Sequence, residues 1–241
     1  MAALYQAARY LAWGLADEPL VRAMKRATFA TQLSLLERTG KGLLLDLGCG
    51  SGFLVELAQE RGWEAWGVEL APAAAAVARK RAGAQFVLEG RLETVALPPD
   101  PFDAITMFDY LEHVRDPLGV LRQCRELLRP GGALLLTTPL VGGFSHRVMG
   151  RRWTQFKAEH LQYFSPASLT VALELTGFHA PQTRPAVKRL SLDYIARHME
   201  LYPHAVLTPL ARLLRRVSGP GLARRHFALR AGDFQALAIR R

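Results

Sequence analysis

Apolar and polar residues alternate through the middle of the chain in blocks that predict β-strands followed by helices. Short apolar runs such as Leu43–Leu47 and Phe102–Phe108 have the length and composition of buried strands. The strands expected from this pattern are 43–47, 64–68, 85–88, 102–108 and 133–138, and the helices are 52–61, 72–82 and 116–128. Strands that alternate with helices predict an α/β fold with a doubly wound parallel sheet, which binds ligands at the carboxyl ends of its strands.

The two flanks of this block follow a different pattern. Residues 1–38 predict helices that precede the first strand, at Ala2–Leu15 and after a cap at Asp17. Beyond Pro139 the sequence predicts a loop at 142–158, a helix capped by Ser165, a short strand near 179–183, basic amphipathic helices over 187–217, and a final strand at 234–239. We therefore expect an N-terminal helical cap (1–40), a main domain (41–184 and 226–241) and a helical insertion (185–225) that acts as a lid or a substrate-binding region.

The most informative stretch is the turn after the first strand, where Gly48, Gly50 and Gly52 alternate with other residues. Glycines allow positive φ and close approach of a ligand, and the turn leads into a helix N-terminus. A dinucleotide fingerprint needs a third glycine where Phe53 stands, and no Walker lysine is present, so a pyrophosphate cradle fits poorly. Glu69 follows the second strand, where nucleotide-binding sheets hold ribose hydroxyls. The expected ligand is a ribonucleoside without a phosphate.

Composition narrows the class of protein. The chain has 241 residues, half of them apolar, and a formal charge of +10. Its apolar runs are shorter than the roughly 18–20 residues of a membrane-spanning helix, and the first residues do not resemble a signal peptide, so we expect a cytoplasmic protein. Cys49 and Cys124 suggest no disulfide framework. Cysteine and histidine show no metal-ligand spacing, so we expect no metal.

Several motifs in order resemble those of class I S-adenosylmethionine-dependent methyltransferases. They are Leu43–Leu54, Glu69, Phe102-Asp103, Asp109-Tyr-Leu-Glu-His113 and Leu128-Arg-Pro-Gly-Gly132. The chain is most similar to the broad group that includes the ubiquinone-biosynthesis-type O-methyltransferases, over about residues 40–180. The resemblance implies a Rossmann-like, seven-stranded, mainly parallel sheet with a reversed last strand. It also implies S-adenosylmethionine as cofactor and S-adenosylhomocysteine as product.

The resemblance assigns cofactor-binding roles to residues that match the family motifs. These are Asp46, Gly48, Cys49, Gly50, Gly52, Glu69, Leu70, Leu92, Glu93, Asp109, Tyr110 and Leu111. Many relatives carry Asp after the glycine of the adenine loop, whereas here Arg91 follows Gly90. Glu93 or a backbone carbonyl is then expected to contact the adenine amino group.

Methyl transfer to a hydroxyl or a carbon acid also needs a base, and histidine has a suitable pKa near 6.5. His113 follows the fourth strand, and His160 and Tyr163 lie in the segment after the fifth strand. We expect these three residues to act as base or substrate contacts. The alternative is that they cap a helix or fix a loop.

The acceptor is less constrained than the cofactor. We expect a small molecule methylated at oxygen, and the alternative is an RNA or a lipid-like substrate bound through the basic C-terminal region. Nucleic acid is disfavoured, because aromatic residues are not interleaved with the basic run. The basic amphipathic stretch 207–216 is suited to peripheral membrane contact. Packing on its own domain or on a second subunit is the alternative, so both a monomer and a homodimer remain open.

Overall fold

The computed structural model describes residues 19–37, 40–201, 203, 206–230 and 232–241. The expected first helix, Ala2–Leu15, and the cap Asp17 lie outside the described residues. The second expected helix is present as α3 (Pro19–Leu36).

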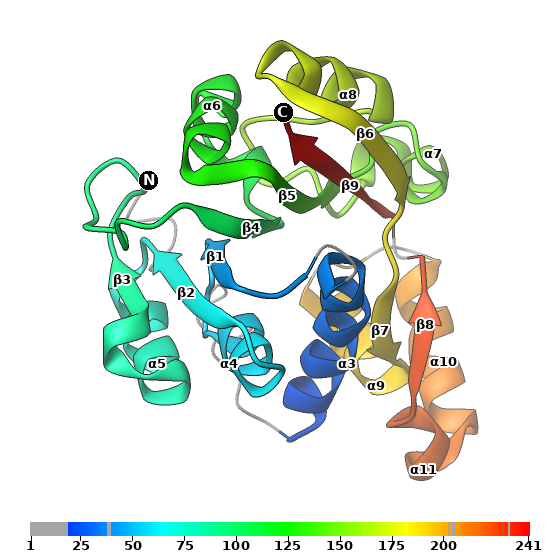
Figure 1. Cartoon of the computed structure of the whole chain (residues 1–241). Coiled ribbons are helices and arrows are strands. Elements are labelled where there is room, and N and C mark those ends of the chain that lie inside the picture. Colours follow the sequence, from blue (N-terminus) through cyan, green and yellow to red (C-terminus); the bar gives the residue numbers. More distant parts are fainter. Residues whose placement is uncertain (1–18, 38–39, 202, 204–205, 231) are drawn as a thin grey trace.

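A seven-stranded sheet forms the centre of the molecule, with strand order β3-β2-β1-β4-β5-β9-β6 (Figure 1). Its strands are β1 (Leu43–Leu47), β2 (Glu64–Glu69), β3 (Val87–Glu89), β4 (Phe102–Phe108), β5 (Leu128–Pro139), β6 (Phe178–Pro185) and β9 (Asp233–Arg240). Strands β1 to β5 pair in parallel, whereas β9 runs antiparallel to both β5 and β6. The predicted doubly wound sheet with a reversed last strand is confirmed.

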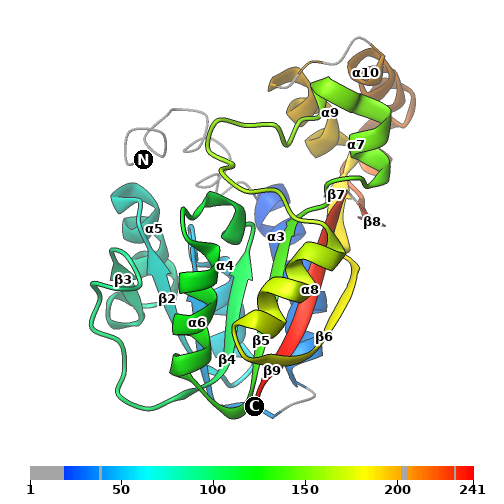
Figure 2. The ribbon, with the colours of Figure 1, turned by 90° about the horizontal axis from the view of Figure 1, so that it is seen from above.

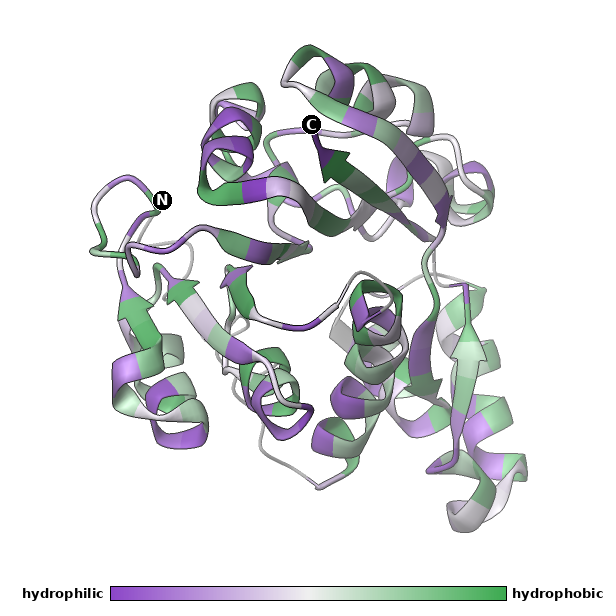
Figure 3. Ribbon diagram, viewed as in Figure 1, coloured by the Kyte–Doolittle hydropathy of each residue, from purple (hydrophilic) through white to green (hydrophobic). Residues whose placement is uncertain are grey.

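Helices cover both faces of this sheet (Figures 1 and 2). α3, α4 (Phe53–Glu60) and α5 (Pro72–Ala82) pack on one face, where Leu33, Leu54 and Ala78 meet sheet residues such as Leu44 and Ala104. α6 (Pro117–Leu127) and α8 (Pro166–Leu175) pack on the other face through residues that include Leu121, Leu169 and Leu173. The central strands β1, β4 and β5 are mostly apolar and buried, as expected for strands between two helical layers (Figure 3).

Local sequence signals account for the starts of α6 and α8. The Asp116 carboxylate accepts from Gly119 N at 2.9 Å, and Pro117 takes the first helical position. Ser165 and Ser168 form a reciprocal capping box before α8. Both predicted caps are confirmed. Short helical turns complete this half of the chain: Ala84–Phe86, Leu111–His113, α7 (Phe144–Met149) and Gly150–Arg152. The loop predicted over 142–158 is therefore partly helical.

The segment between β6 and β9 contains two strands that the sequence pattern did not predict. β7 (Lys188–Ser191) and β8 (His226–Leu229) form a separate antiparallel pair. Between them lie α9 (Leu192–Leu201), α10 (Leu207–Val217) and α11 (Gly219–Ala223). The prediction that 187–217 is entirely helical was wrong at its start, because the four-residue β7 run is too short to show a period. The division into cap, main domain and insertion stays a proposal.

Both ends of this segment meet the sheet at one edge. β6 is parallel to β5, so it ends at the edge where the other parallel strands end, and β9 starts there. Pro185 pairs with Phe234, and Pro139 pairs with Asp233. The insertion therefore emerges beside the carboxyl ends of the strands, which is the ligand-binding edge of such sheets. No helix in the described part of the chain is long and apolar enough to cross a membrane.

Candidate functional site

The glycine turn joins β1 to α4 and is fixed by backbone hydrogen bonds. The N–H groups of Gly48 and Cys49 both donate to Val68 O, at 2.9 and 3.1 Å. Gly48 has φ +72°, and a Cβ added there would lie 2.6 Å from Tyr110 Cδ2. Glycine is thus required at this position both by the backbone conformation and by the aromatic ring that lies against it.

Glu69 ends β2 and connects the turn to the neighbouring strand. Its Oε2 accepts from Gly50 N at 2.8 Å, and its Oε1 accepts from Ala71 N at 2.7 Å. Burial raises the pKa of this carboxyl, although the two N–H donors oppose the shift. Each carboxylate oxygen keeps a second lone pair, so Glu69 can still accept from the hydroxyls of a ribose.

Two further acids stand at the ends of neighbouring strands. Asp46 in β1 is buried and accepts from Thr106 Oγ1 at 2.7 Å. Burial, helped by nearby Glu69, raises the pKa of Asp46 to about 7. Asp109 follows β4 in a left-handed conformation, with φ 53°. Burial would raise the pKa of Asp109, but the ammonium of Lys188 at 2.8 Å holds it below its usual range.

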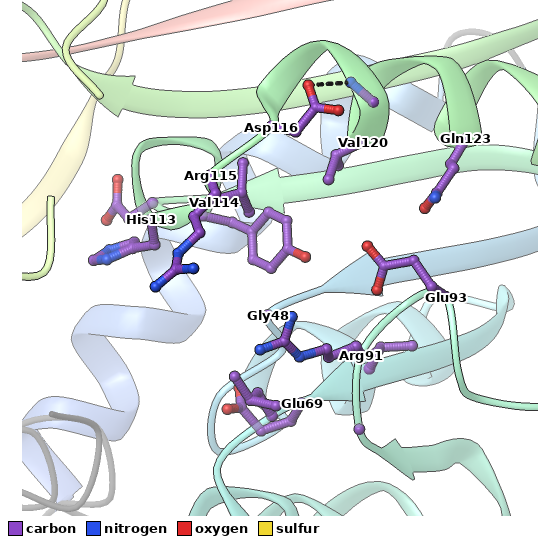
Figure 4. Close-up of a pocket in the computed structure, with 16 residues that line it drawn as sticks. Gly48, Glu69, Arg91, Glu93, His113, Val114, Arg115, Asp116, Val120 and Gln123 are labelled. Atoms are coloured by element: carbon purple, nitrogen blue, oxygen red, sulfur yellow. Dashed lines mark hydrogen bonds between the residues drawn. The ribbon is translucent and has the colours of Figure 1, made fainter. Parts of the chain in front are cut away.

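A cavity of about 560 Å³ opens between these strand ends (Figure 4). Its lining comes from the glycine turn, the ends of β2, β3 and β4, and the first turns of α6: Gly48, Val68, Glu69, Leu70, Gly90, Arg91, Glu93, Asp109, Tyr110, His113, Val114, Arg115, Asp116, Gly119, Val120 and Gln123. Figure 4 shows His113 at one end of the cavity and Glu93 with Gln123 toward the other. The volume falls within the range of roughly 300–1,000 Å³ typical of small-molecule sites.

The structure brings half of the predicted cofactor residues to the cavity wall. These are Gly48, Glu69, Leu70, Glu93, Asp109 and Tyr110. The other six do not line the cavity: Asp46, Cys49, Gly50, Gly52, Leu92 and Leu111. Gly50, for example, acts through its hydrogen bond to Glu69. The roles of all twelve in cofactor binding stay predictions.

Sequence reasoning missed two groups of residues at this site. Five lining residues come from the loop before α6 and its first turns: Arg115, Asp116, Gly119, Val120 and Gln123. Asp116 was predicted to cap this helix, and the helix starts beside the carboxyl end of β4, where ligands bind. The sequence pattern could therefore have placed these five residues at the site. Lys188 lies 79 residues beyond Asp109 in a strand that the pattern did not show, and no local signal points to their contact.

His113 and His160 meet beside the cavity. Their ring centroids are 4.7 Å apart with nearly perpendicular planes. Nδ1 of His113 lies 3.0 Å from the Glu159 carbonyl oxygen, while Nδ1 of His160 is buried without a hydrogen-bond partner. Burial lowers the pKa of His113, and burial together with His113 lowers the pKa of His160 to about 3.

The buried carboxyl of Glu112 completes this histidine cluster. Its Oε2 accepts from Thr138 Oγ1 at 3.1 Å, its Oε1 has no partner, and burial raises its pKa to about 8. One atom each from Glu112, His113 and His160 lie within 4.8 Å of one another, close enough to share a cation. Sequence spacing showed no such grouping, because His160 comes from a distant loop. The expectation that no metal is used stays a prediction.

Tyr163 packs in the loop after β5 and does not line the cavity. Its hydroxyl donates to the Gln155 carbonyl at 3.3 Å, and its ring packs against Phe156 and Trp153. Tyr163 and His160 are not among the residues that line the cavity, whereas His113 is. Of the three predicted catalytic residues, His113 is the one that lines the cavity, and the catalytic roles of all three stay predictions.

The lining suits S-adenosylmethionine. Glu69 can hold the ribose hydroxyls, and the Gly48 turn leaves backbone rather than side chain at the wall. Glu93 also lies in the wall and can accept from an adenine amino group. Among the described lining residues there is no lysine for a pyrophosphate, and Arg91 and Arg115 supply the positive charge.

Comparisons with known proteins agree with this geometry. A family model described as a methyltransferase domain matches residues 21–182. A ubiquinone biosynthesis O-methyltransferase of Xanthomonas campestris is 41% identical over 100 residues, which cover 39% of this chain and 42% of that protein. One from Xylella fastidiosa is 32% identical over 148 residues, which cover 56% of this chain and 60% of that protein. The matches thus span less than two thirds of these relatives.

Solved structures share the fold at low sequence identity. A methyltransferase of Thermotoga maritima, described as SAM-dependent, has a TM-score of 0.65 at 19% identity and covers 100% of this chain and 99% of that one. The magnesium protoporphyrin IX methyltransferase of Synechocystis, solved with bound S-adenosylhomocysteine, has a TM-score of 0.64 at 13% identity and covers 100% and 98%. The family match covers well over half of the chain and includes every described residue that lines the cavity. The chain therefore belongs to the methyltransferase-domain family.

Proposed function

We propose that the protein transfers the methyl group of S-adenosylmethionine to an oxygen atom of a small molecule and releases S-adenosylhomocysteine. The observation that carries this proposal is the cavity itself, with Glu69 in one wall and His113 at its far end (Figure 4). The relatives from Xanthomonas and Xylella are named O-methyltransferases, which supports oxygen as the acceptor atom.

When bound, S-adenosylmethionine supplies a methyl group on a sulfonium, a reactive donor with a neutral leaving group. The main contribution of the protein is then to position the acceptor, which is worth roughly 7–11 kcal/mol in favourable cases. Glu69, Asp109 and the Gly48 turn hold the donor side of the cavity. The acceptor occupies the end near His113.

His113 is the residue that we assign as general base. The Glu159 carbonyl oxygen 3.0 Å from Nδ1 can only accept, so Nδ1 carries the hydrogen and Nε2 carries the lone pair. Burial lowers the pKa of His113, which keeps the ring neutral near pH 7. The neutral ring can take the proton of an acceptor hydroxyl, and the Glu159 carbonyl then stabilises the cation that forms.

Calorimetry and a product assay test the proposal separately. The protein should bind S-adenosylhomocysteine with micromolar affinity and show no heat with NAD; the reverse would overturn the cofactor assignment. Radiolabelled S-adenosylmethionine should label acceptors that carry phenolic or alcoholic hydroxyls. Labelling of amines with no labelling of hydroxyls would overturn oxygen as the acceptor atom.

We propose as a second possibility that the acceptor is lipid-like and that α10 rests on an anionic membrane. Leu210, Leu213 and Val217 lie at i, i+3 and i+7 on one face of α10 and are 47%, 57% and 69% exposed. Arg216 adds an exposed cation beside them. An apolar stripe beside cationic side chains favours anionic lipid over neutral lipid.

Vesicle co-sedimentation tests this second proposal. The protein should sediment with vesicles that contain phosphatidylglycerol at low salt and much less with pure phosphatidylcholine. Leu213→Ser/Val217→Ser should reduce sedimentation. Equal recovery with both kinds of vesicle, or no recovery at low salt, would remove the membrane proposal.

A further inference from the structure

Lys188 is a partly buried cation that bridges the insertion, the sheet and the cavity wall. Its Nζ lies 2.8 Å from Asp109 Oδ2 and 2.8 Å from Asp233 Oδ2. Asp233 begins β9 and is 3% exposed, and Lys188 itself begins β7. One ammonium therefore joins the start of the insertion to two acids, one of which lines the cavity.

Asp109 is held by more than this ion pair. Its N–H donates to Thr137 O at 3.0 Å, and its Oδ1 accepts from Thr137 Oγ1 at 3.1 Å. These contacts hold it at φ 53°, a conformation that costs an L-residue other than glycine energy and persists only where its surroundings enforce it. Lys188 supplies the contact to the second carboxylate oxygen.

The conformation of Asp109 sets the position of the next residue. The Tyr110 ring lies against Gly48, so close that a Cβ there would be 2.6 Å from Cδ2. Tyr110 and Gly48 both line the cavity. A change in the backbone at Asp109 would therefore move the ring that shapes the wall opposite the glycine turn.

We propose that Lys188 is a positioning residue for cofactor binding, which acts through Asp109 and thereby couples the insertion to the cavity. Lys188 is not among the lining residues, so it acts on the wall and not on the ligand. The backbone also joins β7 to α3, because Arg189 N donates to Thr28 Oγ1 at 2.8 Å. β7 is thus held at the residue next to Lys188.

The alternative is that Lys188 only neutralises buried Asp233. Under that alternative its loss would lower stability but leave cofactor affinity intact in the molecules that remain folded. The two roles differ in whether Asp109 is needed for the effect. A double-mutant cycle between Lys188 and Asp109 separates them, because residues that act through one contact give non-additive effects.

Calorimetric titration with S-adenosylhomocysteine tests the inference, which rests on the proposed function. Lys188→Met should weaken binding about tenfold, roughly the coupling of a close charge pair. Arg189→Met is the matched control, since it removes an exposed positive charge from the same strand and should leave affinity unchanged. In the Asp109→Asn background the further effect of Lys188→Met should shrink to about twofold or less.

Circular dichroism first establishes that each variant is folded. If Lys188→Met does not fold, Lys188→Met/Asp233→Asn replaces it, because that pair leaves no unpaired charge at Asp233.

In steady-state assays the KM for S-adenosylmethionine should rise about tenfold while kcat changes by less than about threefold. Unchanged affinity in a folded Lys188 variant would overturn this inference but not the proposed function. The same tenfold loss in the unaltered and the Asp109→Asn backgrounds would do so too. Failure of the unaltered protein to bind S-adenosylhomocysteine would instead overturn the proposed function.

Discussion

The backbone N–H of Gly50 donates to Glu69 Oε2 over 2.8 Å, so the glycine turn and the end of β2 form one unit. This hydrogen bond crosses from one strand end to the next at the ligand edge of the sheet. It places the carboxylate that is expected to hold a ribose directly against the turn that is expected to border the rest of the cofactor.

Replacement of Glu69 should therefore weaken cofactor binding. Glu69→Ala should cost about 1.5–3 kcal/mol of affinity for S-adenosylhomocysteine, as for a lost hydrogen bond to a charged group. Isothermal titration calorimetry measures the change. Glu64→Ala, at the exposed start of the same strand, is the control and should bind normally. Normal binding by Glu69→Ala would show that this carboxylate does not hold the ligand.

The glycine turn itself should respond unequally to alanine. Gly48→Ala brings a Cβ within 2.6 Å of Tyr110 Cδ2, whereas Gly50→Ala meets nothing within 4 Å, and both positions have positive φ. Each variant should lose about 1–2 kcal/mol from the left-handed backbone, and Gly48→Ala should lose more because the ring must move. Chemical unfolding without cofactor gives both values. Equal losses would mean that the Tyr110 contact is unimportant for stability.

The proposed base should affect turnover more than cofactor binding. His113→Asn should lower kcat about 100-fold or more, as is typical when a general base is removed, while the affinity for S-adenosylhomocysteine changes little. Since burial lowers the pKa of His113, kcat/KM in the unaltered enzyme should stay level as the pH falls to 6.5 and decline only below that. Pre-steady-state and pH-rate measurements check both points. Full turnover by the His113→Asn variant would show that His113 is not the general base.

The buried carboxyl of Glu112 should make stability fall as the pH rises. Its pKa is about 8 in the folded protein and about 4.5 when unfolded, so between these values the folded state binds more protons. Its contribution is complete below pH 4.5 and is lost by about pH 8, with a slope of up to about 1.4 kcal/mol per pH unit. Glu112→Gln should therefore gain stability relative to the unaltered protein as the pH rises from 5 to about 8.

Urea unfolding at several pH values, with and without a chelator, measures this difference. The curves should be the same in both conditions, in keeping with the prediction that no metal is used. A chelator-dependent curve would show that a cation, and not a proton, neutralises the Glu112, His113 and His160 cluster. A constant difference between the variant and the unaltered protein would show that Glu112 ionises normally in the folded state.

The parts of the molecule with strong local signals could be predicted from the sequence. The Asp116 and Ser165 caps and the β4 strand, Phe102–Phe108, fell where the pattern placed them. Each depends on residues within a few positions of one another, so a single sequence contains the information. The glycine turn and Glu69 were accessible for the same reason, because parallel strands bring their carboxyl ends to one edge.

Contacts made between distant segments could not be predicted in this way. Lys188 meets Asp109 across 79 residues, and His160 meets His113 across the loop that follows β5. Neither contact leaves a periodicity or a spacing in the sequence. β7 was missed because four residues, Lys188–Ser191, are too few to distinguish a strand from the start of an amphipathic helix.

The pairing of Pro185 with Phe234 has a consequence for how this fold can vary. Residues 186–232 leave and re-enter the sheet at adjacent strands, so topologically they form one long hairpin loop. Lengthening such a loop costs little, about 0.6 kcal/mol for each doubling of its length. Beyond Lys188, which holds Asp109, this segment can thus be exchanged or resized without disturbing strand register. A descendant could acquire a new acceptor while keeping the same methyl-donor half.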